Sequence, residues 1–421
     1  MTVPTQPVTS LKVFWRSVGV VLTGAAVAQS IPLLGALVIA RLYAPAEFGL
    51  FSAWLGMVMI AAVVVTGRFE MALAVEPDGA PRRFAMVATL VMTLLVSALI
   101  GVSALAALVS GRLPDQVNLG VVTLWVLAAS LVGVTHTWQA WAAAEGNYRG
   151  LSWIRIAQAI IITGAQIVAG LISPTAFGMM LGYFLGLAVG IVCAIYVMPV
   201  WLPEMAEEGD LWLRLKEFWY RQRRFPLLAL PADTINAASG QLPLLFIASR
   251  FGAEASGLYA LTVRILGAPI SLLGAAVLDV FKRQAATSYR EKGNCKEEYT
   301  RTFWLLAAGG LGLALGVVLL AEQLFVVAFG EPWRYAGTIA LWLIPMFVMR
   351  FVASPLSYVL YIAGKQHVDL AWQCALLLVT VAAFLSFSHF DTSVQLYAAA
   401  YSSLYIIYAM LSYRYSKGGL P

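Results

Sequence analysis

Two arginines, Arg350 and Arg264, lie inside long apolar stretches of the sequence. A charge at that depth in a membrane is costly unless a partner or a wet cavity receives it. Arg350 stands midway between Pro345 and Pro355, and proline removes helix hydrogen bonds that only a protein interior or a cavity replaces. A guanidinium stays charged, and its planar fork matches the oxygens of phosphate or carboxylate. Both arginines are therefore predicted to bind an anionic group.

Each of these arginines also has a purely structural interpretation. Arg350 could pair with a carboxylate on another helix, such as Asp233 or Asp279. Arg264 stands near the outer end of its stretch and could extend its charge to the outer lipid headgroups. The sequence leaves both alternatives open.

Residues 227–249 form an apolar stretch that polar side chains interrupt too often for a lipid-facing helix. Asp233, Asn236 and Gln241 are among them, with a proline on either side. We predict a bent helix that lines a cavity, because amide and hydroxyl groups suit the hydroxyls of a sugar. Hydrogen bonding between helices is the alternative for such residues.

Arg68 and Glu70 follow the apolar stretch 48–67, within the sequence Gly-Arg-Phe-Glu. Both charges are predicted to lie near the cytoplasmic mouth of the protein and to contribute to substrate binding. A local salt bridge between the two is the alternative.

The sequence offers no residues that would support catalysis or metal binding. The sequence contains no glycine-rich phosphate loop, no zinc motif and no nucleophile–base pair. Its three histidines are isolated, and its three cysteines are scattered without a CxxC pair. We therefore expect a protein that is not an enzyme and that uses no cofactor or metal.

The composition identifies the elements that must position these residues. Of 421 residues, 61% are apolar and 11% are charged, against about 45–50% and about 25% in soluble domains. Twelve stretches are long enough to cross a hydrocarbon core of roughly 30 Å. They are residues 18–39, 48–67, 84–110, 119–142, 154–172, 175–198, 227–249, 257–281, 303–321, 336–363, 370–387 and 393–413. The sequence thus predicts an all-α integral membrane protein, and the net charge of +6 is too dispersed for a nucleic-acid partner.

The longest polar connection covers residues 201–225 and separates six spans from six. Carboxylates occupy the first half of this connection, and basic residues occupy the second half. This pattern predicts an amphipathic helix on the cytoplasmic face, with Trp212, Phe218 and Trp219 at the membrane surface. The predicted division is a lobe at 1–200, this connecting loop, and a lobe at 226–421.

The distribution of Lys and Arg predicts the orientation. With both termini inside, only Arg41, Arg112, Arg250 and Arg334 fall on the outer face, and Arg264 and Arg350 lie within spans. The remaining 21 of the 27 basic residues are cytoplasmic, as expected because cytoplasmic loops retain positive charge.

Internal similarity predicts that the two halves are repeats. The sequence from Arg41 to Phe51 resembles that from Arg250 to Tyr259, with Gly49 and Gly257 in equivalent places. A second similarity relates the turns that follow the fourth and tenth spans. Matches between spans one and seven, and between four and ten, predict a parallel repeat of two six-helix lobes.

These sequences resemble the polysaccharide biosynthesis proteins. The resemblance rests on residues 41–51, 67–77, 225–233, 257–269 and 329–337, and it extends over nearly the whole chain. These proteins include oligosaccharide flippases of the Wzx type, within the multidrug, oligosaccharidyl-lipid and polysaccharide exporter superfamily. Compared with them the chain is short, with no additional helices to hold a lipid tail.

The resemblance implies two six-helix lobes around a central cavity. The implied activity is transfer of undecaprenyl-diphosphate-linked oligosaccharide across the bacterial inner membrane by alternating access, for O-antigen, capsule or exopolysaccharide. Membrane lipid, a polysaccharide polymerase and a chain-length regulator are the implied partners, and a proton or a sodium ion the coupling ion. A multidrug or cation antiporter and a membrane polysaccharide polymerase are the alternatives. The two deep cations favour an anionic ligand over the antiporter's cations, and the short outer connections disfavour the polymerase.

Overall fold

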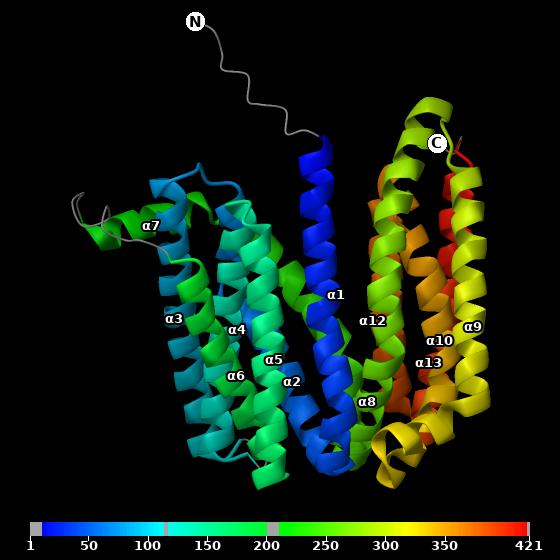
Figure 1. Ribbon diagram of the computed structural model, residues 1–421, viewed down its shortest axis with the longest axis horizontal. Coiled ribbons are helices and arrows are strands. Elements are labelled where there is room, and N and C mark those ends of the chain that lie inside the picture. The colour runs from blue at the N-terminus through cyan, green and yellow to red at the C-terminus, as the bar shows by residue number, and fades with distance from the viewer. Residues whose placement is uncertain (1–10, 113–116, 200–209, 419–421) are drawn as a thin grey trace, which may run out of the picture. The chain divides into compact units, whose positions relative to one another are not determined.

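The computed structural model describes residues 11–112, 117–199 and 210–418. The side chains of residues 11–22 and of five positions in 271–279, Asp279 among them, lie outside this description. The chain divides into two compact units (Figure 1). Unit 1 comprises Met1–Leu42 and Trp54–Gln241, and unit 2 comprises Tyr43–Ala53 and Leu242–Pro421.

Unit 1 is a helix bundle whose members begin and end at clear sequence signals. Its helices are α1 (Leu11–Leu42), most of α2 (Pro45–Val65), the short 3-10 helix η1 (Phe69–Ala74), α3 (Ala80–Val109), α4 (Leu119–Ala144), α5 (Tyr148–Ile172), α6 (Ala176–Val197), α7 (Leu211–Arg221), the π-helical turn η3 (Phe225–Ala229) and the start of α8 (Leu230–Lys292). Asn118, Asn147 and Thr175 cap α4, α5 and α6, because each side chain accepts a hydrogen bond from a free amide of the first turn.

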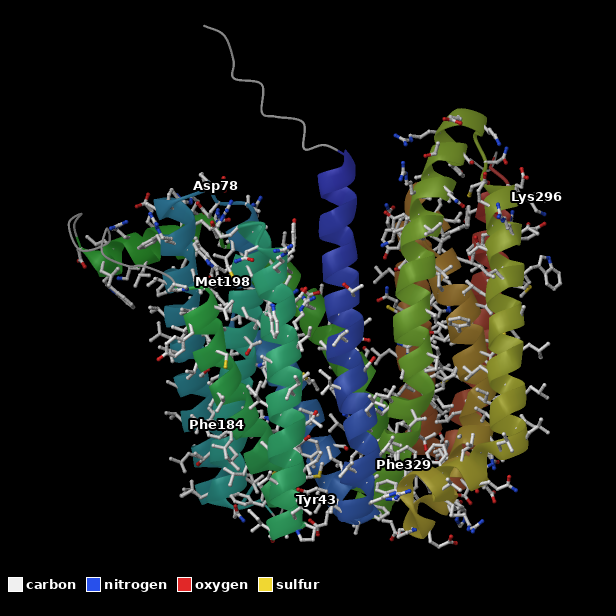
Figure 2. All side chains as sticks on the ribbon, viewed as in Figure 1. Tyr43, Asp78, Phe184, Met198, Lys296 and Phe329 are labelled. Atoms are coloured by element: carbon white, nitrogen blue, oxygen red, sulfur yellow. The ribbon has the colours of Figure 1, made fainter. Side chains whose placement is uncertain are left out.

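Unit 2 contains the rest of α8 and the helices that follow it. These are α9 (Lys296–Phe329), η4 (Glu331–Trp333), α10 (Arg334–Leu356), α11 (Val359–Ile362), α12 (Gln366–Ser386) and α13 (Phe390–Ser416). Gly252 interrupts α8 with φ of 90°, a backbone conformation that glycine adopts without steric cost. Between Lys296 and Phe329, at the two ends of α9, the projecting side chains are mostly hydrocarbon, as expected for a helix that faces lipid (Figure 2).

Ten helices of the described chain are long and apolar enough to cross a membrane. They correspond to ten of the twelve predicted spans, so the protein is a multi-pass, all-α integral membrane protein. The other two predicted spans, 227–249 and 257–281, lie on either side of Gly252: the first begins in η3 and continues into α8, and the second falls within α8.

The predicted amphipathic helix corresponds to α7, which runs across the direction of the bundle beside the end of α3 (Figure 1). The first part of the predicted loop, residues 201–209, lies outside the described residues. One expectation for α7 is wrong: Phe218 does not face a membrane surface but is 2% exposed and packs against Phe69 and Phe84. Trp219 is half-buried, and its indole N–H donates to the carbonyl of Ala88, whereas Trp212 is exposed.

The two similar segments at the ends of the first and seventh predicted spans meet within unit 2. A Cβ atom placed on Gly49 would lie 1.8 Å from the carbonyl oxygen of Ala253, and one on Gly257 would lie 1.9 Å from that of Pro45. The two contacts are reciprocal, because Pro45 precedes Gly49 by the same four residues as Ala253 precedes Gly257. Glycine is therefore required at both places for the backbones to cross this closely.

Candidate functional site

The first polar cluster is built on a tight turn at the end of α2. Gly67 and Arg68 have φ of 56° and 60°, and Arg68 is the one non-glycine residue with positive φ among those described. The backbone N–H of Arg68 donates to Thr66 Oγ1 at 3.2 Å, which helps to hold the turn. A left-handed conformation costs a non-glycine residue of order 1–3 kcal/mol and persists only where its surroundings impose it.

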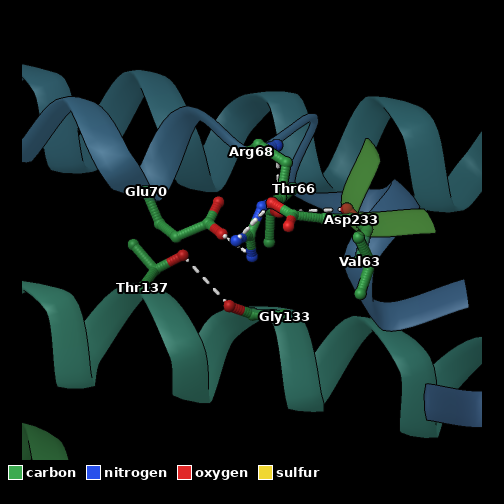
Figure 3. A network of polar contacts seen from close by, with 7 residues as sticks. All are labelled: Val63, Thr66, Arg68, Glu70, Gly133, Thr137 and Asp233. Atoms are coloured by element: carbon green, nitrogen blue, oxygen red, sulfur yellow. Dashed lines mark hydrogen bonds and ion pairs between the residues drawn. The ribbon is translucent and has the colours of Figure 1, made fainter. Parts of the chain in front are cut away.

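The turn directs the Arg68 guanidinium between two carboxylates (Figure 3). Arg68 Nη1 lies 2.8 Å from Glu70 Oε1, and Arg68 Nη2 lies 2.7 Å from Asp233 Oδ2. Glu70 is 7% exposed at its side chain, Arg68 is 22% and Asp233 is 35%. The local salt bridge, which was the alternative interpretation of Arg68 and Glu70, therefore exists, and it extends to a third residue that lies on α8.

Three buried polar atoms of this cluster have no hydrogen-bond partner among the described residues. They are Arg68 Nε, Glu70 Oε2 and Thr234 Oγ1. An unsatisfied buried polar atom costs about 1–3 kcal/mol. Arg68 and Glu70 thus retain one donor and one acceptor without a partner among the described residues, and so does the hydroxyl of Thr234, the residue after Asp233.

Further polar side chains from α4 and α5 surround the cluster. His136 lies within electrostatic reach of Glu70, Arg68 and Arg155, and Arg155 Nε donates to Gln139 Oε1 at 3.2 Å. Sequence reasoning treated His136 as isolated and counted Arg155 only as a cytoplasmic charge. The missed signal was spacing, because polar residues three apart within apolar helices share one face.

Asn236 and Gln241 lie on the same initial turns of α8 as Asp233, within unit 1. Asn236 is exposed, and Gln241 is half-buried beside Gly56 of α2. Three residues predicted from the polar stretch are thus on one short helical segment, but Asp233 alone contacts Arg68.

A second network fixes α7 to unit 1. The buried carboxylate of Glu76 accepts from Arg221 Nη2 at 2.9 Å and from Gln222 Nε2 at 2.6 Å. Arg82, also buried, pairs with Asp78 and with Glu145. The charges of Glu76 and Arg82 are therefore neutralised by partners on neighbouring elements.

Arg350 and Arg264 belong to unit 2, whereas the Arg68 cluster belongs to unit 1. Arg350 is exposed at mid-length of α10, and its electrostatic neighbours are the hydroxyls of Tyr259, Tyr401 and Tyr405. Of the two carboxylates expected as structural partners, Asp233 pairs with Arg68 instead, and the side chain of Asp279 is outside the described set. Arg264 is half-buried on α8.

The hydroxyls near Arg350 belong to a row of tyrosines that the sequence analysis missed. Tyr397, Tyr401, Tyr405 and Tyr408 recur on one face of α13 at helical spacing. The hydroxyls of Tyr259, Tyr397 and Tyr401 lie within electrostatic reach of one another. The row therefore supplies neutral donors and acceptors along the interior of unit 2.

Asp369, at the start of α12, is a second feature that sequence reasoning missed. It is 6% exposed, and its oxygens accept hydrogen bonds from the hydroxyl of Tyr408, from Tyr361 Oη at 2.9 Å and from Gln373 Nε2 at 2.8 Å. Its hydrogen-bond donors in the described chain are thus all neutral. The aromatic spacing on α13 was the available signal, since Tyr408 continues the row.

Comparison with solved structures defines the class. The fold is similar to that of a multidrug resistance MATE family transporter of the MOP superfamily, with a TM-score of 0.68, 13% identity, and coverage of 91% of this chain and 93% of that one. It is equally similar to lipid II flippase MurJ in an inward closed conformation, with a TM-score of 0.68, 9% identity, and coverage of 93% and 87%. At such identities the likeness establishes the fold alone: that of MOP superfamily transporters.

Sequence comparison then gives the family. Residues 38–337 match the model of the polysaccharide biosynthesis protein family, and the chain belongs to that family, as its motifs predicted. Teichuronic acid biosynthesis protein TuaB of Bacillus subtilis (strain 168) is 24% identical over 155 residues, or 37% of this chain. That match spans 32% of the length of TuaB.

Proposed function

We propose that this protein is a flippase for undecaprenyl-diphosphate-linked oligosaccharide repeat units. It moves them from the cytoplasmic to the periplasmic leaflet by alternating access, for synthesis of O-antigen, capsule or exopolysaccharide, and it performs no covalent chemistry. Family membership and the transporter fold support this proposal. The relatedness to a teichuronic acid biosynthesis protein is in keeping with a glycan pathway.

Arg350 is the observation that carries the proposal. An exposed guanidinium at mid-length of a membrane-spanning helix is costly, and its described neighbours are neutral hydroxyls that do not balance its charge. A diphosphate or an acidic sugar would balance it, with the fork geometry that Arg provides. The tyrosine hydroxyls beside it would hydrogen-bond the same ligand.

The Arg68 cluster has a complementary role in this proposal. Arg68 is shared between Glu70, which is buried, and Asp233, which is more exposed. A phosphate oxygen can replace Asp233 as the partner of Arg68. This leaves no buried charge unpaired, because the Asp233 carboxylate is already partly exposed. Asn236, Gln241 and Arg264 complete the proposed set of substrate-binding residues.

The wider architecture is part of the same proposal. We place twelve spans in two six-helix lobes, 1–200 and 226–421, related by a parallel repeat around a central cavity. The reciprocal contact of Gly49 and Gly257 supports the repeat, since equivalent positions meet about a pseudo-two-fold axis. Both termini and α7 lie in the cytoplasm of a bacterial cell, with the chain in its inner membrane.

Labelling tests this orientation directly. A cysteine should replace Lys216 on α7, which is exposed, whereas the preceding residue Leu215 is buried. An impermeant thiol reagent should reach it only after the inner membrane is opened. Labelling in intact cells, at the level of a periplasmic control position, would reverse the topology.

Transport of the lipid-linked oligosaccharide is the test of function. Purified protein in proteoliposomes should expose the labelled glycan to an external glycosidase, and Arg350→Ala should abolish this exposure. Arg334→Ala is the matched control, because Arg334 is an exposed arginine at the start of the same helix. If the wild-type protein does not expose the glycan to the glycosidase but does export cationic dyes, the antiporter alternative is favoured.

The coupling ion and the partner proteins are further proposals. Glu70 and Asp233 are the carboxylates through which a proton or a sodium ion would act. A polysaccharide polymerase and a chain-length regulator would receive the product. A dependence of glycan exposure on an imposed proton or sodium gradient distinguishes the two ions.

A further inference from the structure

Helices α1 and α5 of unit 1 pack side by side through small residues (Figure 1). A Cβ atom on Gly24 would lie 2.3 Å from Ser152 Oγ, and one on Gly35 would lie 2.2 Å from Thr163 Cγ2. The two contacts are eleven residues apart on both helices, so the helices run parallel and in register. Small residues allow such close approach in membranes.

A furrow opens beside the Gly24–Ser152 contact. It has a volume of about 380 Å³, and its other lining residues are Thr23 and Val27 of α1 with Arg149, Trp153 and Ile156 of α5. Val27 is 48% exposed and Trp153 is 66% exposed. Exposed apolar groups on a membrane-spanning helix suit contact with lipid, and tryptophan favours the level of the headgroups.

Arg149 is the one charged residue in the lining. It is exposed, and its side chain makes no ion pair or hydrogen bond within the parts of the chain that the structure describes. It stands in the first turn of α5, where the helix dipole disfavours a cation. Other cations at this end of unit 1, such as Arg68, Arg82 and Arg221, are paired with carboxylates.

We propose that this furrow binds one anionic membrane phospholipid, of the phosphatidylglycerol type. Its phosphate contacts the guanidinium of Arg149, and one acyl chain lies along Val27 and Ile156. Charge complementarity selects the phosphate, and the hydrocarbon lining selects the chain. A diphosphate-linked glycan fits less well, because the furrow offers one cation and lacks amide and carboxylate side chains for sugars.

This site is independent of the proposed transport function, so each can fail without the other. The full-length protein, delipidated in detergent, is titrated with phosphatidylglycerol, phosphatidylcholine or undecaprenyl diphosphate, and bound lipid is counted by native mass spectrometry. We expect one phosphatidylglycerol to bind, at least tenfold more tightly than phosphatidylcholine. Arg149→Gln should weaken it about tenfold, while Arg112→Gln, which removes another exposed charge, should leave it unchanged.

A second variant tests the apolar half of the furrow. Val27→Trp fills the space beside Gly24 without changing any charge, and it should also reduce binding. Unfolding temperatures measured without added lipid verify that both variants fold. Equal binding by wild-type and Arg149→Gln proteins, or displacement of phosphatidylglycerol by equimolar undecaprenyl diphosphate, would overturn the proposal.

Discussion

Units 1 and 2 accommodate the charges on their helices in different ways. In unit 1, Arg68 is held between Glu70 and Asp233 by two short ion pairs. In unit 2, Arg350 has tyrosine hydroxyls around it, and Asp369 is buried beneath two tyrosines and a glutamine. The first arrangement compensates charge internally, whereas the second solvates each charge with neutral groups.

The difference separates an arginine that is also needed for stability, Arg68, from one that is needed for the ligand alone, Arg350. A buried ion pair is costly to break, because removal of one partner leaves the other charged and desolvated. An arginine that lies among neutral hydroxyls has no carboxylate partner. Its replacement therefore leaves no charge unpaired and weakens mainly the binding of its anionic ligand. Stability should therefore depend on Arg68 and export on Arg350.

Replacement of Arg68 should have the largest effect. Arg68→Ala leaves Glu70 without its cation, and we expect a loss of about 3–5 kcal/mol of stability, seen as reduced abundance and a lower unfolding temperature. Adding Glu70→Gln and Asp233→Asn should restore abundance without restoring export. If Arg68→Ala protein is as abundant as wild type, the cluster is not a structural ion pair.

Arg350→Lys should act on export alone. Lysine keeps the charge but cannot make two parallel hydrogen bonds, and the loss of one charge-assisted bond costs about 1.5 kcal/mol, or roughly tenfold in rate. Abundance should remain normal. Reduced abundance, rescued by neutralising Asp279, would instead identify Arg350 as half of a structural pair.

Asp369→Asn should have a smaller effect on stability. The amide oxygen still accepts from Tyr408 or Tyr361 but loses the carboxylate's second acceptor, which predicts a loss of about 1 kcal/mol. Thermal unfolding in detergent measures this. A loss as large as that of Arg68→Ala would show that unit 2 also depends on internal charge pairing.

Glu331→Gln should have the smallest effect. Glu331 makes an ion pair with Arg334, 2.7 Å long, but both side chains are exposed, and solvent screens such pairs. Abundance and export should match wild type. A clear loss of either would mean that exposed pairs matter here as much as the buried Arg68 cluster.

Much of the scaffold could be predicted from hydropathy, because spans near 20 apolar residues are set by membrane thickness. The Arg68–Glu70 pair was also accessible, since the residues are two apart. Its extension to Asp233 was not, because that residue is distant in sequence and no local pattern encodes the contact. Asp369 was overlooked in part for the same reason, because its donor Tyr408 lies on α13 and is distant in sequence. The burial of Phe218 was missed because an amphipathic pattern does not distinguish a protein surface from a lipid surface.

The position of Tyr43–Ala53 within unit 2 has a consequence for biogenesis. Tyr43, Phe48 and Phe51 are each at most 3% exposed, and Phe48 packs edge-on against Trp333. A ribosome that adds about 5–20 residues per second reaches Trp333 on the order of tens of seconds after it has made this segment. During that interval the segment lacks its final packing partner, while the helices before and after it are already available for insertion. The first half of the chain therefore cannot mature before much of the second half has been synthesised, and a ribosome that stalls before Trp333 leaves it incomplete.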